Sequence, residues 1–164
     1  SEAPQLYPVF PYRYYGVGKP DIETAVNTYW NDPQVIKYKT HEGWRQHPIF
    51  AACLGLTEEA RMLVEKKMEN GQFRFPAFRG PGMDWTPDHN WLGAGSIALQ
   101  EMLMQCNDRE ILLAPAWPKD WDVKFKLHAP YQTVVSGEIR NGRLKSLIVT
   151  PKEREKDVRF LLGE

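Results

Sequence analysis

The residues best suited to chemistry lie in one polar, aromatic-rich loop that leads into an apolar segment. Between Gly80 and Trp91 this loop carries two carboxylates, Asp84 and Asp88, and the second is followed by His89. A carboxylate directly before a helix usually caps its free N–H groups, but helix amino ends also favour polar or negatively charged ligands. Asp88 therefore has two interpretations. It either caps the following helix or lies at the mouth of a pocket.

Carboxylates in an aromatic loop suit the hydrolysis of glycosidic bonds. That reaction needs two groups on opposite sides of the scissile bond, one to protonate the leaving oxygen and one to activate water or attack. Because Asp84 and Asp88 stand on one short loop, they could supply one of these roles but hardly both; Glu42 is a third carboxylate to consider. Aromatic residues make up 12% of the chain, and many stand in loops, where they either edge a core or stack on sugar faces.

Other familiar catalytic and metal-binding motifs are incomplete. His41 and Glu42 begin a zinc-protease pattern, but Arg45 stands where the second histidine is required. The segment 79–82 lacks the Lys-Ser/Thr pair of a phosphate-binding loop, and no serine stands in a nucleophile elbow. The other histidines have no ligand spacing. We therefore predict neither a metal nor a cofactor.

Composition restricts the partners. The 21 Lys and Arg residues balance the 21 Asp and Glu residues, which argues against nucleic acid or an anionic membrane as a partner. The longest near-continuous apolar run, 48–56, is far shorter than the roughly 20 residues that span a bilayer. Cys53 and Cys106 stand in apolar helical patterns, so we interpret them as reduced and structural, with a disulfide as the alternative.

Hydrophobic periodicity indicates four helices in the first part of the chain. Asp21 is expected to cap the first, which ends before Pro33, and Thr57 to cap the third. The last helix is apolar on nearly every face, as is typical of a helix surrounded by protein. The third is expected to turn inward four residues: Ala60, Leu63, Val64 and Met68. The second helix is expected within 42–54, where Pro48 either opens the helix proper or kinks it. The last two predicted ranges are 58–69 and 91–106.

The period changes from 3.6 to 2 near residues 107–110, which predicts a helical part over 1–108 and a β domain over 109–164. Asn141-Gly142 stands between two alternating runs, 133–140 and 143–150, and is a strong hairpin signal. This turn places Ile139 opposite Leu144 and Glu138 opposite Lys145. About five short strands then suggest an antiparallel sheet or sandwich, including one over 123–127 and a last one over 158–162.

The segment from Asp88 resembles the carboxyl-terminal end of glycoside hydrolase family 95 and related six-hairpin glycosidases. Asp88-His89-Asn90-Trp91, the Gly-rich apolar helix ending in Glu-Met-Leu-Met-Gln and the segment 110–118 are similar to an Asp-Gly-Asn element, a helix and a strand of that family. Leu6-Tyr7-Pro8 and the Gly43-Trp44 helix are similar to two earlier elements, in the same order. The resemblance covers nearly the whole chain.

The resemblance implies an α+β architecture in which the helices are the closing hairpins of an (α/α)6 barrel and 109–164 form a terminal antiparallel β domain. Family members are inverting α-L-fucosidases or α-L-galactosidases, in which an Asp polarises an Asn that activates water. Asp88 matches that Asp. The implied sugar-contact residues are Trp85, His89, Asn90 and Trp44.

Further expectations follow from the same resemblance. The general acid would lie upstream of Ser1, in an amino-terminal part of the same protein that would be the partner of this chain. The chain alone is then expected to be inactive, and family habit implies secretion or a periplasmic location. His89 replaces the family's Gly, and two extra residues lie between Asp88 and Glu101, so the substrate is expected to differ. The alternative is a non-catalytic module that binds glycan or another partner, in which Asp88 merely caps the helix.

Overall fold

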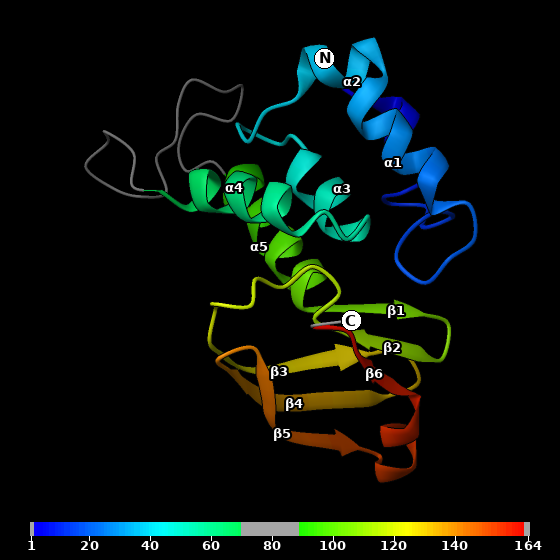
Figure 1. Ribbon diagram of the computed structural model, residues 1–164, viewed down its shortest axis with the longest axis vertical. Coiled ribbons are helices and arrows are strands. Elements are labelled where there is room, and N and C mark those ends of the chain that lie inside the picture. The colour runs from blue at the N-terminus through cyan, green and yellow to red at the C-terminus, as the bar shows by residue number, and fades with distance from the viewer. Residues whose placement is uncertain (1, 70–88, 163–164) are drawn as a thin grey trace.

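The computed structural model describes residues 2–69 and 89–162. Helices gather at one end of the molecule and strands at the other, and α5 (His89–Leu103) runs from the helical end into the strands (Figure 1). The prediction of a mixed α+β fold is confirmed. The described residues do not show an (α/α)6 barrel; they form five α-helices and two short 3-10 helices.

The amino-terminal helices differ from the prediction at Pro33. α1 (Ile22–Asn31) ends as expected, but α2 (Pro33–Tyr38) begins there, after the 3-10 helix η1 (Pro4–Leu6) and α1. Proline is well suited to the first position of a helix, so it starts α2 here as well as ending α1. Asp32 caps α2, since its Oδ1 accepts hydrogen bonds from the backbone N of Gln34 and Val35 at 2.9 and 3.0 Å. Asp21 does not cap α1; it has a φ of 55° and no capping hydrogen bond.

The remaining helices also correct the predicted ends. α3 (His47–Cys53) lies within the predicted 42–54, and Pro48 opens it, which is one of the two expected alternatives. α4 (Thr57–Met68) includes Thr57 as a helical residue without a capping bond. Ala60, Leu63 and Val64 are buried as predicted, but Met68 is 37% exposed and Lys67 is buried in its place. α5 ends at Leu103 because the next residues pair with a strand. Both cysteines are free thiols.

The strands form two three-stranded sheets at one end of the molecule (Figure 1), and one hydrophobic cluster contains residues of both sheets. In the first, β2 (Glu110–Leu113) pairs antiparallel with β1 (Met104–Asn107) and parallel with β6 (Val158–Phe160). The 3-10 helix η2 (Lys152–Asp157) precedes β6. The second sheet is wholly antiparallel, in the order β3 (Val123–Ala129), β4 (Thr133–Arg140), β5 (Arg143–Thr150). The predicted antiparallel arrangement is therefore right except for β6.

The hairpin of β4 and β5 has the predicted ends. Ile139 lies opposite Leu144 as expected, but Glu138 lies opposite Ser146 because a bulge follows Glu138. Lys145 becomes the extra residue of that bulge. Glu138 instead forms ion pairs with Lys124, at 3.7 Å, and with Arg140.

Two hydrophobic clusters hold these parts together. The larger one runs through α1, α3, α4 and α5 and includes residues of the strand end: Leu113, Ala116, Trp117 and Ile139. The smaller one, built on Met104, Ile111, Val135 and Val149, lies between the two sheets. Because α5 passes into β1 without a connecting loop, its two ends lie in the two parts of the fold.

Candidate functional site

Only some of the predicted site residues fall within the described part of the chain. Asp88 and Trp85 lie outside it, as does Asp84. His89 and Asn90 are the first two residues of α5, and both are exposed. Trp44 lies in the segment before α3 and is half-buried.

The amino-terminal half of α5 packs closely on α4. A Cβ atom at Gly95 would lie 2.7 Å from Met68 Cε and 3.3 Å from Lys67 Cδ, so a larger residue there requires the neighbouring side chains to move. Gly93 is exposed and has no described atom within 4 Å of such a Cβ. The small residues that start this helix therefore have different roles. Gly95 permits helix packing, and Gly93 leaves an open surface beside His89 and Asn90.

Lys67 joins the Gly-Trp segment to α5. This side chain is fully buried, and its Nζ donates hydrogen bonds to the carbonyl oxygens of His41 and Gly43 at 2.5 and 2.8 Å. On the other side, Trp91 Nε1 donates to the Lys67 carbonyl oxygen at 2.8 Å, and the Lys67 Nζ lies 5.1 Å from the centre of the Trp91 ring. A buried ammonium requires such partners to offset its lost hydration. The sequence regions around 43 and 91 are thus held against each other.

His41 strengthens this junction. Its ring meets the Trp91 ring edge-on, with the centroids 5.9 Å apart. Burial lowers the pKa of His41, and the nearby Lys67 charge acts in the same direction. The imidazole is therefore neutral near pH 7, where it packs on the indole as an aromatic ring without adding a second positive charge beside Lys67.

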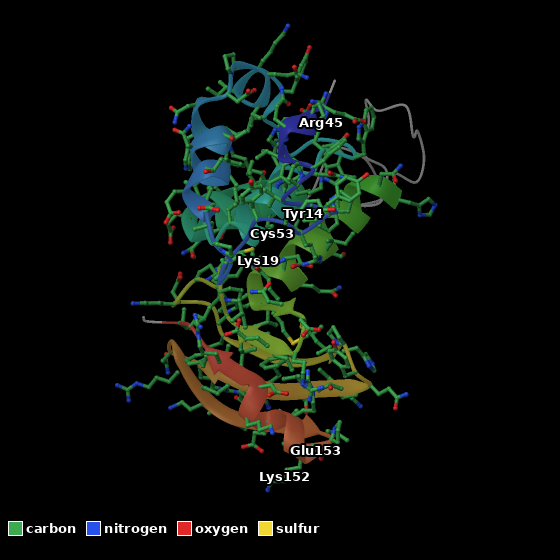
Figure 2. All side chains as sticks on the ribbon, turned by 90° about the vertical axis from the view of Figure 1, so that its right-hand side faces the viewer. Tyr14, Lys19, Arg45, Cys53, Lys152 and Glu153 are labelled. Atoms are coloured by element: carbon green, nitrogen blue, oxygen red, sulfur yellow. The ribbon has the colours of Figure 1, made fainter. Side chains whose placement is uncertain are left out.

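Trp44 lines a small pocket that neither His89 nor Asn90 lines. This pocket has a volume of ≈ 40 Å³ and is bordered by the amino-terminal segment and the start of α3. The Arg45 guanidinium lies 5.8 Å from the Trp44 ring centre, in the outer part of the helical end (Figure 2). Among the described residues, no hydrogen bond or ring contact joins Trp44 to His89 or Asn90. The lining residues are Glu2, Ala3, Tyr7, Trp44, Arg45, Gln46, His47 and Phe50.

His47 lines the same small pocket as an unpaired imidazole. It is 1% exposed, and neither ring nitrogen forms a hydrogen bond within the described part of the chain. Burial lowers the pKa of His47 to about 4. The nearby Val35 backbone has a smaller, opposite effect on this pKa. The Oε1 atom of Gln46 is likewise buried without a described partner. A volume of this size holds a water molecule rather than a sugar.

The structure also brings together a polar cluster that the sequence did not indicate. The Arg13 guanidinium binds Glu101 through two parallel hydrogen bonds, Nη1 to Oε2 at 3.0 Å and Nη2 to Oε1 at 2.5 Å. The hydrogen bond to Glu101 is the main reason that the pKa of Arg13 is raised. Cys53 Sγ lies 3.8 Å from Glu101 Oε2, and burial raises the pKa of the Cys53 thiol. The one sequence signal for this cluster is a carboxylate, Glu101, inside an otherwise apolar helix.

Several kinds of site are not found in the part of the chain that the structure describes. No three or more His, Cys, Asp or Glu side chains are grouped so that they could hold a metal ion. None of the described helices is long and apolar enough to cross a membrane.

No protein-family model matches the sequence, and no curated protein matches it significantly.

Proposed function

We propose that this chain is the carboxyl-terminal part of an inverting glycoside hydrolase with α-L-fucosidase-like or α-L-galactosidase-like activity. Asp88 orients the group that activates water, and Trp85, His89 and Asn90 contact the sugar. The general acid is supplied by an amino-terminal part of the same polypeptide, outside the cytoplasm. No cofactor takes part in this mechanism.

One observation carries the proposal. The two segments that resemble sugar-site elements, 43–44 and 88–91, are more than 40 residues apart in the sequence, and Lys67 links their described parts through Gly43 O and its contacts with Trp91. Two exposed side chains, His89 and Asn90, stand at this junction. A buried lysine at such a position fixes backbone geometry beside a helix amino end, where polar ligands bind well.

The test is hydrolysis of an aryl α-L-fucoside and an aryl α-L-galactoside by the complete polypeptide. Asp88→Asn should lower kcat by about 10²–10⁴-fold, the usual contribution of acid–base catalysis, and leave the melting temperature unchanged. Asp120→Asn is the matched control, because Asp120 pairs with Arg61 on the surface; it should retain full activity. Full activity in Asp88→Asn, or a complete polypeptide that cleaves neither substrate, would overturn the proposal.

A glycan-binding module without catalysis is the second candidate. Tyr12 and Tyr14 are 63% and 71% exposed, and their rings are stacked with centroids 6.3 Å apart and an interplanar angle of 22°. Exposed rings of this kind present flat apolar surfaces to sugar faces. Glycan binding by the complete polypeptide that Tyr14→Ala removes, with no hydrolysis of either substrate, would favour this function.

A further inference from the structure

A pocket of ≈ 320 Å³ lies where the helical end meets the strands. It is bordered by the end of α5, by β1, by β3 and by Arg13 of the amino-terminal segment. In Figure 2, the labelled residues Cys53 and Lys19 lie in the part of the helical end that is next to the strands. Small-molecule pockets are about 300–1,000 Å³, so this one suits a small ligand. Its lining includes Arg13, Gln100, Glu101, Gln105, Leu127 and His128.

The pocket is separate from the proposed catalytic site. Glu101 stands twelve residues after His89 on the same helix, which spans His89–Leu103. With a helical rise of 1.5 Å per residue, the two positions are roughly 18 Å apart along the helix axis. A ligand of one sugar ring cannot contact both.

The charges of the pocket cancel. The only strongly charged described side chains that line it are Arg13 and Glu101, and they neutralise each other through the two-bond ion pair. Lys19 fixes this arrangement, because its Nζ donates a hydrogen bond to the Arg13 carbonyl oxygen. A charged ligand would gain little from such a pair, so the pocket suits a neutral one.

Polar groups nevertheless remain to bind a ligand. Gln105 is 6% exposed; its Nε2 donates to the carbonyl oxygens of Ala52 and Glu101 at 2.8 and 2.9 Å. Its Oε1 receives no hydrogen bond from any described residue, and it belongs to a side chain that lines the pocket. This oxygen is therefore free to accept a hydrogen bond, which water or a ligand hydroxyl can supply. Gln100 and His128 add exposed polar groups at the rim.

The remaining lining is apolar or weakly polar. Met104 is almost fully buried, Leu127 is half-buried, and Pro130 closes the rim beside His128. Burial raises the pKa of the Cys106 thiol, so it contributes surface and not a thiolate. A wall of this kind contacts C–H groups, while the amide and carboxylate groups contact hydroxyls.

We propose that this pocket binds a neutral polyhydroxylated molecule the size of one monosaccharide. Hydroxyl groups both donate and accept hydrogen bonds, which matches the free Gln105 oxygen, the Glu101 carboxylate and the Arg13 guanidinium together. This binding goes beyond the proposed hydrolysis and does not depend on it.

The test is an NMR titration of the ¹⁵N-labelled chain with L-fucose, D-galactose and myo-inositol. At least one of them should cause saturable shifts at the Gln105 side-chain amide and at the His128 backbone amide. Gln100→Trp places an indole at the exposed rim and should weaken binding about tenfold. Ser96→Trp is the matched control, because it adds the same group one turn nearer the amino end of α5, at another exposed position.

The outcomes separate this proposal from the catalytic one. Asp120→Asn, a surface variant that does not line the pocket, should leave the affinity read from the Gln105 and His128 shifts unchanged, and loss of hydrolysis in Asp88→Asn has no bearing on it. Absence of saturable shifts with all three probes would overturn the proposal. So would equal affinity in the wild type and Gln100→Trp, or shifts that centre on Asn90 and disappear in Asn90→Ala.

Discussion

His47 shows how a single residue can make the stability of the fold depend on pH. Its imidazole is buried, and burial lowers its pKa from 6.5 to about 4. In the unfolded chain the imidazole is exposed and titrates near 6.5. Between these two values the unfolded chain binds a proton that the folded chain does not bind. The free energy of unfolding therefore rises with pH through this window. The contribution of His47 to stability is lost as the pH falls toward 4.

We expect this group to lower the free energy of unfolding by roughly 2–4 kcal/mol between pH 7 and pH 4. Urea unfolding at both pH values measures the change. His47→Gln removes the titrating imidazole, so its loss of stability over the same range should be smaller by that amount. His128→Gln is the control, because His128 is exposed. Wild type and His47→Gln with identical pH dependence would show that burial of His47 is not the cause.

Buried charged residues are the part of the site that the sequence reveals least. Lys67 occupies the last turn of an amphipathic helix, where a lysine usually faces solvent, and its burial depends on carbonyl groups 24 and 26 residues away. Glu101 depends on Arg13, at a separation of 88 residues. Such partners leave no local pattern. By contrast, an exposed His128 follows directly from strand alternation.

Elements were predictable where the deciding signal is local. Asn141-Gly142 specifies the hairpin because both residues adopt positive φ, 49° and 68°. The bulge after Glu138 was not predictable in this way, since it depends on how two strands align. β6 pairs parallel with β2, across more than 40 residues, and a short alternating run does not encode that direction. At Pro33 the residue type fits both a helix end and a helix start.

The packing of α5 on α4 gives a prediction at the same scale. Replacing glycine by alanine in an exposed helix position gains about 0.5–1 kcal/mol of helix propensity, so Gly93→Ala should stabilise the protein by that amount. Gly95→Ala should not show this gain and should destabilise the protein by about 1 kcal/mol, because its Cβ would lie 3.3 Å from Cδ of the anchored Lys67 side chain. Thermal unfolding of the two variants gives the comparison. Equal melting temperatures would contradict close packing at Gly95.

At the scale of the whole molecule, the main core does not stop at the change from helices to strands. Ile139 of β4 is fully buried in the same cluster as residues of α3, α4 and α5. Two further bonds cross the junction: Gln105 of β1 donates to Ala52 of α3, and Asn107 donates to the Val17 carbonyl at 2.9 Å. The division into parts 1–108 and 109–164 stays a prediction. It can be tested by measuring whether the two parts unfold together or separately.

We expect the chain to unfold in one transition, because separate melting of either part would expose this shared core. The far-ultraviolet circular dichroism, which reports the helices, and tryptophan fluorescence, which includes buried Trp117, should give coincident curves. Ile139→Ala should lower the stability seen by both probes by about 2–4 kcal/mol. Ile148→Ala, a 64% exposed position on the neighbouring strand, should change it little. Two separate transitions, or a loss of stability in Ile139→Ala that only one of the two probes detects, would show that the helices and the strands do not unfold together.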